Sequence, residues 1–281
     1  MAATITGQTS ALVRYRVNFG AEQTVPMTST GGDTFSATIP GSAAGNLIRY
    51  RVEATNANGT NRSPRVDDTV GFRGVVVQDG ITSAIPIFRW FIADADYNAI
   101  TGQPTEDIIR PAVLAYGTTV YDNVLVNIRG QGSETSVKPN WKFEMPQGHD
   151  FDMPGLLVEP VDEFAMQADV SDVAHGRSML GFDAYRRAGV INTQVFPVRT
   201  QRNGAFQAST TTSTCTTAPG ASARGTTITS SSRRTSTRST RPCRCRTGGS
   251  RRRLRTTATT PRCSPSSTAS RSRGAPSGAI C

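Results

Sequence analysis

One stretch of the chain combines closely spaced glycines with its only two lysines. Gly130 and Gly132 lie in a predicted loop, and Lys138 and Lys142 follow shortly after it. Glycines let a backbone approach a ligand closely, and N–H groups in such a turn can cradle phosphate oxygens. A lysine ammonium is a compact cation suited to phosphate charge. The pattern indicates a phosphate site, but a tight hairpin with surface lysines explains a lone glycine pair as well, and spacing alone favours the hairpin.

A second polar group precedes a predicted helix. Ser171 and Asp172 come directly before a helical run at residues 173–188, and Gly189 follows it in the position of a C′ glycine. Either polar residue can cap the helix, which is the ordinary role of an aspartate at this place. The stripe expected to face inward from this helix comprises Val173, Leu180, Ala184 and Tyr185.

Other candidate chemistry is weaker. Residues 148–152 (GHDFD) contain side chains that bind metals, but Pro146 and Pro154 flank them and favour a turn. His175 has no cluster of partners, and no Ser/His/Asp triad can be argued from spacing.

The elements that would position these residues are mostly strands. Residues 120–128 alternate and run into the glycine loop, and residues 141–145 return from it. The side chains expected to face inward from the first of these strands are Val124, Val126 and Ile128. Residues 85–93 form an apolar core strand, residues 195–200 form another, and residues 202–205 (RNGA) form a hairpin turn.

The N-terminal part predicts a small antiparallel β-sandwich over residues 8–68. Alternating strands are expected at 11–19 and 47–54, with a short strand at 35–39. This part resembles the immunoglobulin or fibronectin type III-like modules of secreted bacterial proteins, which implies adhesion or, more simply, a passive spacer. Few strand residues precede Leu12, which leaves open whether the sandwich is complete at its start.

The composition divides the chain at Gln207. Residues 1–207 carry 17 Lys and Arg against 21 Asp and Glu, whereas residues 208–281 carry 14 Arg and no acid, so the net charge of +10 arises in the tail. Of the 74 tail residues, 33 are Ser or Thr, and none is aromatic, Val or Met. We expect the tail to be disordered, because so few apolar side chains cannot offset the entropy of ordering. All five cysteines lie in it, so no disulfide links residues 1–207.

A slip of the reading frame after Gln207 explains this tail better than an evolved basic arm does. If one base is restored in a GC-rich gene, Thr codons become codons for Tyr, His, Asn or Asp, and many Ser codons become codons for Phe, Leu, Ile or Val. With suitable synonymous codons, residues 207–217 then become Gln-Gly-Leu-Tyr-Asn-Tyr-Ile-Asp-Leu-Tyr-Asp. The alternatives are an arginine-rich arm that binds nucleic acid and a basic solvated linker.

Three motifs in order resemble those of the spore-coat protein H (CotH) kinase-like family. Residues 129–133 (RGQGS), followed by residues 138–143 (KPNWKF), resemble its Arg-Gly-x-x-Ser…Pro-Lys-Lys motif. Asp172 with Arg177 resembles its Asp-x-x-x-x-Arg at the start of a helix. Residues 202–206 (RNGAF) resemble its Asn-Gly-x-Tyr hairpin, which the restored frame would continue as Gly-Leu-Tyr.

The resemblance, which covers residues 84–207, implies an atypical protein-kinase-like fold that uses ATP and a divalent cation, Mg²⁺ or Mn²⁺. It implies that Asp172 and Lys138 are catalytic. The nucleotide-binding residues that it implies are Arg129, Gly130, Gly132, Ser133, Lys138, Lys142 and Arg177. The chain departs from the family where Lys138 follows Val137 rather than Pro, and where metal-binding acids would follow Gln207, so the metal ligands stay unknown.

We therefore expect an α+β protein with four parts. These are a small antiparallel β-sandwich at 8–68, a linker at 69–83, the N-terminal portion of a truncated atypical protein-kinase-like α+β domain at 84–207 and a disordered tail at 208–281. The intact parent would transfer the γ-phosphate of ATP to Ser or Thr of a coat or surface protein, and the chain as written would be inactive.

The expected location is extracellular or on the spore surface, by resemblance, although the chain shows no signal peptide. No apolar run is long enough for a membrane-spanning helix, which needs about 18 residues. The first alternative is a non-catalytic extracellular adhesion or scaffold protein. The second is nucleic-acid binding through the tail, which we do not favour.

Overall fold

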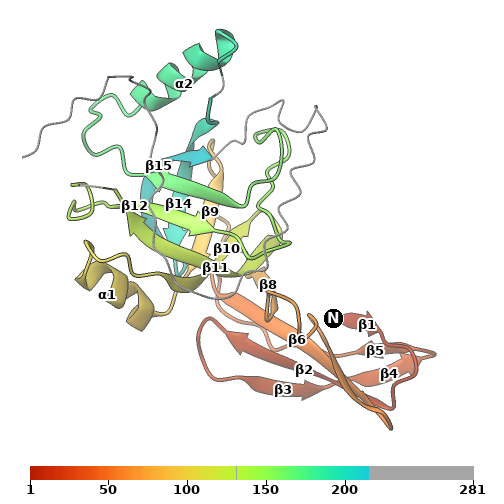
Figure 1. Cartoon of the computed structure of the whole chain (residues 1–281). Coiled ribbons are helices and arrows are strands. Elements are labelled where there is room, and N and C mark those ends of the chain that lie inside the picture. The colour runs from red at the N-terminus through yellow and green to blue at the C-terminus, as the bar shows by residue number, and fades with distance from the viewer. Residues whose placement is uncertain (131, 191, 215–281) are drawn as a thin grey trace, which may run out of the picture. The chain divides into compact units, whose positions relative to one another are not determined.

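The computed structural model describes residues 1–130, 132–190 and 192–214 (Figure 1). They belong to one compact unit, Met1–Thr226. This unit holds two successive modules, a β-sandwich and a closed β-barrel. The described residues contain fifteen strands and two helices, so their regular secondary structure is mostly β-strand.

The first module consists of two sheets that share an apolar core. One sheet has the strand order β1-β5-β4, and the other has the order β3-β2-β6-β7 with β8 beside β6. The strands are β1 (Ala2–Thr4), β2 (Ser10–Val17), β3 (Gln23–Pro26), β4 (Thr28–Gly31), β5 (Thr34–Ser36), β6 (Leu47–Asn56), β7 (Gly59–Ser63) and β8 (Arg73–Val76).

Alternating side chains build this core, as the sequence predicts. Ala11, Val13 and Tyr15 of β2 are buried, while the residues between them point to the other face and are partly exposed. Phe35 of β5 joins the same cluster from the opposite sheet. The strands predicted at 11–19 and 47–54 are confirmed, and β1 adds a further strand by pairing with β5.

Strand β6 shares one of its edges between two partners. Residues 52–56 pair with β7, whereas residues 47–50 pair with β8. The segment 69–83, expected to be a linker, thus contains a strand that completes the five-stranded sheet. A Cβ atom on Gly74 of β8 would lie 2.5 Å from a methyl carbon of Val120 in the barrel. Glycine is needed at this position because β8 and the barrel approach so closely.

The second module is a closed barrel with the strand order β10-β11-β12-β13-β15-β14-β9. Neighbouring strands are antiparallel, except that β9 and β14 are parallel where the barrel closes. The strands are β9 (Ile87–Phe91), β10 (Arg110–Tyr116), β11 (Thr119–Arg129), β12 (Asn140–Glu144), β13 (Glu163–Gln167), β14 (Val195–Arg202) and β15 (Ala205–Thr214).

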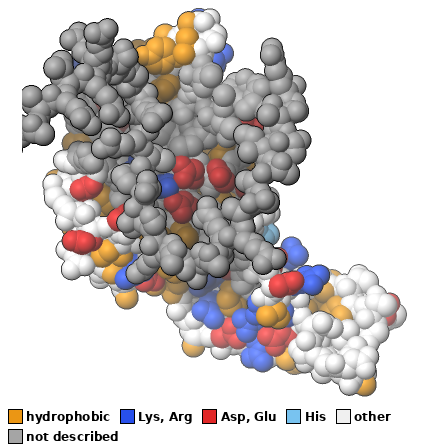
Figure 2. All heavy atoms as spheres, in the orientation of Figure 1, with side chains coloured by type: hydrophobic (Ala, Val, Ile, Leu, Met, Phe, Trp, Pro, Cys, Tyr) orange, Lys and Arg blue, Asp and Glu red, His pale blue; other side chains and the backbone are white. Residues whose placement is uncertain are grey.

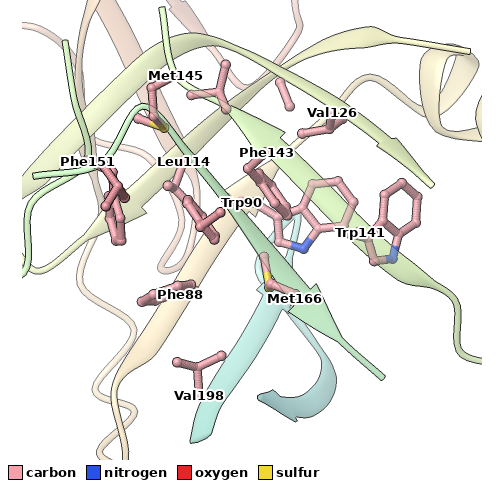
Figure 3. Packing of buried hydrophobic residues seen from close by; sticks show 14 of the residues in the cluster. Phe88, Trp90, Leu114, Val126, Trp141, Phe143, Met145, Phe151, Met166 and Val198 are labelled. Carbon is pink, nitrogen blue, oxygen red and sulfur yellow. The ribbon is translucent and has the colours of Figure 1, made fainter. Parts of the chain in front are cut away.

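Large aromatic side chains fill the barrel (Figure 3). The rings of Trp90 and Trp141 lie 5.0 Å apart between centroids, and Phe143 stacks on Phe164 at 5.1 Å. Each fully buried side chain of this size contributes roughly 1.5–3 kcal/mol. The three residues predicted to face inward from β11 are buried in the same core: Val124, Val126 and Ile128. This core holds the strands from which the glycine loop projects.

The α+β organisation expected for residues 84–207 is not what the structure shows. Only α1 (Asp94–Gly102) and α2 (Arg177–Arg187) accompany the barrel strands within the described residues, and neither is long and apolar enough to cross a membrane. The stripe predicted to face inward from α2 is exposed, with Leu180 at 74 % and Tyr185 at 55 %. This prediction was wrong because amphipathic spacing says which side chains share a face, not whether another element covers it.

The last strand continues beyond Gln207, the position at which the composition changes. Residues 208–214 belong to β15 and pair with β13 and β14. The predicted turn at 202–205 is confirmed, since Asn203 and Gly204 have the positive φ angles of a two-residue hairpin, 51° and 82°. The rest of the expected tail, 215–281, lies outside the described residues, so its disorder and the frame slip stay predictions.

Candidate functional site

The glycine loop between β11 and β12 is held by its own side chains. Ser133 Oγ accepts a hydrogen bond of 3.1 Å from Asn140 Nδ2, and Asn140 Oδ1 accepts one of 2.7 Å from the main-chain N–H of Ala168. Gly130 has a φ of 130°, and a Cβ atom there would overlap Ser133 Oγ. The loop therefore needs Gly130 for its own fold, whether or not it binds a ligand.

Lys138 lies at the same end of the barrel. Its ammonium donates a hydrogen bond of 2.5 Å to the carbonyl oxygen of Ser209 in β15. Burial lowers the pKa of Lys138, and the nearby carboxylate of Asp169 opposes that shift. Asp169 in turn accepts a hydrogen bond from the Thr211 hydroxyl. The structure thus brings Ser133, Lys138 and Asp169 into one polar end of the barrel.

Lys142 is not part of that group. It follows Trp141 in β12 and points to the outer side of the barrel wall, because Trp141 and Phe143 point inward. Its ammonium forms ion pairs with Glu144 at 2.5 Å and with Glu163 at 2.9 Å. Burial lowers the pKa of Lys142, but these two carboxylates outweigh burial and raise the pKa above its ordinary value.

Asp172 organises the turn that leads into α2. Its carboxylate accepts hydrogen bonds from the main-chain N–H groups of Ala174 at 3.1 Å, Gly176 at 3.0 Å and Arg177 at 2.8 Å. These bonds, led by that of Arg177, hold the pKa of Asp172 below its usual value. The Arg177 side chain, largely exposed, lies 3.4 Å away. The helix was expected at 173–188 with Ser171 or Asp172 as its cap, but α2 begins at Arg177 and its N-cap is Gly176, so that prediction was wrong. The Asp172 carboxylate instead holds the turn that precedes the helix.

These residues suit a phosphate only in part and do not suit a metal ion. Lys138 and the loop offer donors to phosphate oxygens, whereas Arg129 is exposed at the end of β11. The carboxylates of Asp169 and Asp172 are already hydrogen-bonded. Within the described residues, no group of three or more His, Cys, Asp or Glu side chains could hold a metal ion. The cation implied by the family resemblance therefore has no ligand set in this part of the chain.

A second polar region lies on the outer face of the five-stranded sheet, and we call it the arginine face: Arg14, Arg16, Glu22, Arg49, Arg51 and Glu53. Figure 2 shows basic and acidic side chains gathered over this module. Glu22 lies 3.2 Å from Arg16 and 3.0 Å from Arg51, and Glu53 lies 2.6 Å from Arg14 and 3.0 Å from Arg51. Burial would raise the pKa of Glu53, but its arginine partners outweigh burial and lower it.

An aromatic ring from the segment between β7 and β8 lies against this face. The centroid of the Phe72 ring is 4.7 Å from the guanidinium carbon of Arg16, 5.1 Å from that of Arg51 and 5.5 Å from that of Arg49. Arg49 also lies 4.7 Å from the ring centroid of Phe19. Such cation–π contacts hold planar, polar side chains in fixed positions.

A buried ion pair joins the arginine face to the barrel. Asp122 of β11 is buried and accepts a hydrogen bond of 3.2 Å from Arg49 Nη1. Its other oxygen accepts bonds of 3.1 and 3.0 Å from the main-chain N–H groups of Gly71 and Phe72. Burial lowers the pKa of Arg49, and Asp122 opposes that shift. The pair therefore fixes segment 68–72 between the two modules.

Three further contacts fasten the same segment. The imidazole of His149, in the turn predicted at 148–152, lies 2.8 Å from the Asp68 carboxylate. Thr69 donates to a barrel carbonyl at 2.8 Å, and Asn123 donates to the Thr69 carbonyl at 2.9 Å. Leu47 of β6 packs with barrel residues in a small apolar cluster. The two modules are thus joined by direct hydrogen bonds and apolar contacts.

Two cavities flank segment 68–72 at this junction. One has a volume of about 450 Å³ and is lined by Arg16, Phe19, Arg49 and Phe72 together with Asp96 and Asn123 of the barrel module. The other has a volume of about 530 Å³ and is lined by Tyr50, Phe72, Tyr121 and His149 among others. Both volumes fall within the range of small-molecule sites, roughly 300–1,000 Å³.

Sequence reasoning missed the arginine face, although a signal was present. Arginines occupy alternate positions of two predicted strands, at 14 and 16 and at 49 and 51. Because alternate side chains of a strand share a face, this spacing places the four arginines on the side opposite the core. The junction gave no comparable signal, because Asp122 and Phe72 reach it from different modules.

The fold and these sites define a β-sandwich module joined to a closed β-barrel. Residues 1–63 match the model of carbohydrate binding module family 56. The match ends with β7, so β8 and the whole barrel lie outside it. A sandwich was expected in this part, but the matched family differs from the immunoglobulin or fibronectin type III-like modules that the sequence suggested. No curated protein matches the chain.

Proposed function

We propose that the protein binds carbohydrate through its N-terminal module and acts as a non-catalytic adhesion or scaffold protein. The match of residues 1–63 to a carbohydrate-binding family carries this proposal. The arginine face supports it, since half-buried Arg and Glu side chains held in place by one another present donors and acceptors to sugar hydroxyl groups. An extracellular location, where polysaccharides are exposed, belongs to the same proposal.

The test is a binding assay with the full chain. The protein is mixed with insoluble α- and β-glucans, mannan, xylan and chitin, and the fraction left in solution is measured. We expect depletion by at least one of these polysaccharides. The variant Arg14→Gln/Arg51→Gln should bind at least tenfold more weakly, because it removes donors from the arginine face.

Arg65→Gln is the matched control, since the Arg65 side chain is 81 % exposed and lies away from that face in an ion pair with Asp67. Circular dichroism should show that both variants remain folded. If no polysaccharide depletes the wild-type protein, carbohydrate binding is not its function.

A second candidate is the phosphoryl transfer implied by the CotH-like resemblance, from ATP to Ser or Thr of a surface protein. Lys138 favours it, because its ammonium lies at the same barrel end as the glycine loop. Against it stand the hydrogen-bonded carboxylate of Asp172 and the missing cation ligands among the described residues. Residues 208–281 as written contain no Asp or Glu, so metal-binding acids would have to come from the frame-restored sequence.

ATP-induced thermal stabilisation tests this candidate without requiring turnover. With Mg²⁺ or Mn²⁺ present, ATP should raise the melting temperature of the wild-type chain and of Lys142→Ala, but not of Lys138→Ala. Equal shifts in all three proteins would exclude Lys138 as a phosphate ligand. No shift in any of them would exclude nucleotide binding by the chain as written.

A further inference from the structure

We propose that the cavity of about 450 Å³ between the arginine face and the barrel is a binding site for a neutral sugar residue, so that both modules bind one glycan. This inference rests on the proposed carbohydrate binding and goes beyond it in two respects. It names the chemical class of the ligand, and it makes the barrel part of the site, although the family match ends at residue 63.

Unpartnered donors at the cavity are the first argument. Arg16 and Arg49 both line it, and the Nε–H of each is buried and finds no hydrogen-bond partner among the described residues. Arg49 is more than nine-tenths buried, with 8 % of its surface exposed. Buried N–H groups are nearly always hydrogen-bonded in native proteins. Because both Nε atoms are buried, a small rotation of either guanidinium toward the cavity would let a ligand oxygen supply the missing acceptor.

Charge decides which kind of oxygen this is. The lining holds the guanidinium groups of Arg16 and Arg49 and the carboxylates of Asp68, Asp96 and Asp122. Asp122 is paired with Arg49, and Asp96 with Arg110 next to the cavity, so the charges are nearly balanced. Without an excess of positive charge the cavity has little attraction for a uronate, sulfate or phosphate group, so neutral oxygens are the favoured acceptors. A sugar hydroxyl can accept from an arginine N–H and also donate to a carboxylate, so the mixed lining suits it.

The apolar part of the lining fits the same ligand. Phe19 and Phe72 contribute aromatic surface, and Pro111 contributes an aliphatic ring from β10 of the barrel. The C–H groups of a pyranose ring present an apolar face that packs against such surfaces, while its hydroxyl groups project toward polar side chains.

The barrel wall is built from residues of α1, β10 and β11. Asp96 of α1 lies 3.2 Å from Arg110, and the Asn123 amide is fixed by its bond to Thr69. These contacts, with the buried Arg49–Asp122 pair, fix the position of the barrel wall of the cavity relative to the wall from the first module. The site is therefore incomplete without the barrel.

The experiment perturbs each wall separately in the full chain. Arg16→Met removes a donor from the module wall, and Pro111→Trp fills the cavity from the barrel wall. The matched controls are Arg65→Met and Pro154→Trp, which alter exposed residues that do not line the cavity. Dissociation constants are measured by calorimetry with oligosaccharides of whichever neutral polysaccharide binds the wild-type protein, and with polygalacturonate and inorganic sulfate as charged probes.

We expect both cavity variants to weaken binding of the neutral oligosaccharide at least tenfold, about 1.4 kcal/mol, and both controls to stay within about twofold of wild type. Thermal melts should show that each variant is folded, and Arg16→Met alone tests the site if Pro111→Trp does not fold. Neutral sugar binding that both cavity variants leave intact would overturn this inference and leave the proposed function standing. If polygalacturonate or sulfate binds more tightly than the neutral oligosaccharide, the assignment of a neutral ligand is wrong. If the protein binds none of these ligands, the proposed function itself is wrong.

Discussion

Replacing Thr212 by valine tests the packing of the barrel wall. Thr212 is fully buried in β15, and its hydroxyl finds no hydrogen-bond partner among the described residues. Its cross-strand neighbours are Met166 in β13 and Phe196 in β14, so the hydroxyl points among apolar side chains. Valine has nearly the same shape as threonine and no polar atom. We therefore expect Thr212→Val to stabilise the folded protein.

The size of the effect follows from the cost of an unpaired polar group. A buried donor or acceptor without a partner costs about 1–3 kcal/mol, and the valine methyl group occupies the same space. We expect the free energy of unfolding to rise by about 1–2 kcal/mol, equivalent to a melting temperature higher by roughly 2–8 °C. Urea unfolding followed by tryptophan fluorescence measures it, because Trp90 and Trp141 are the only tryptophans and both lie in the barrel core.

Thr200→Val is the matched control. Thr200 of β14 is equally buried, but its hydroxyl donates a hydrogen bond of 2.9 Å to the carbonyl oxygen of Ala208. Removing that bond should lower the free energy of unfolding by about 0.5–1.5 kcal/mol. The two variants are thus expected to have effects of opposite sign. A loss of stability in Thr212→Val as large as that in Thr200→Val would refute the reasoning.

Four further predictions concern single positions. Asp122→Ala should destabilise the fold by about 3–5 kcal/mol, because it leaves a buried guanidinium unpaired; an unchanged urea midpoint would contradict this. The N–H of Arg177 and its neighbours lower the pKa of Asp172, so this carboxylate stabilises the fold above its ordinary pKa, and the contribution is lost as pH falls through the lowered value. Asp172→Asn should therefore lose less stability than wild type between about pH 5 and pH 2 in acid-unfolding curves, and parallel curves would argue against it. Gly130→Ala should lower the free energy of unfolding by about 1–3 kcal/mol, because alanine is strained at the φ of 130° that Gly130 adopts. Urea unfolding measures this loss, and an unchanged midpoint would show that the loop does not depend on that conformation. Sequencing the gene across the codon of Gln207 should show one additional base, and an unchanged frame would make the printed tail authentic.

Much of the strand pattern could be predicted from local sequence. Alternation in 11–19, 47–54 and 120–128 identified the strands, and in 120–128 it also identified the buried side correctly, because a half-buried strand places every second side chain in the core. The hairpin at 202–205 was equally clear, since Asn-Gly readily adopts the positive φ angles of that turn. Capping by Asp172 was predicted wrongly, because α2 begins several residues later than expected and Gly176 is its N-cap.

The candidate sites were less accessible to such reasoning. Lys138 and Lys142 are four positions apart, yet one ends at β15 and the other in ion pairs on the outer barrel wall. Spacing could not separate them, because their environments come from β13 and β15, whose pairing depends on the closure of the barrel. The arginine face could have been predicted from the alternation of arginines, but the contact of Arg49 with Asp122 could not.

The sequence by itself therefore determined the strands, the turns and which side chains share a face, because these depend on neighbours within a few residues. Only the tertiary structure decided that residues 84–214 close into a barrel, that β8 completes the sheet of the first module and that α2 keeps an exposed apolar side. It also decided that Arg49 and Asp122, 73 positions apart, share one buried ion pair. Such contacts arise from the packing of distant segments, and no local pattern encodes them.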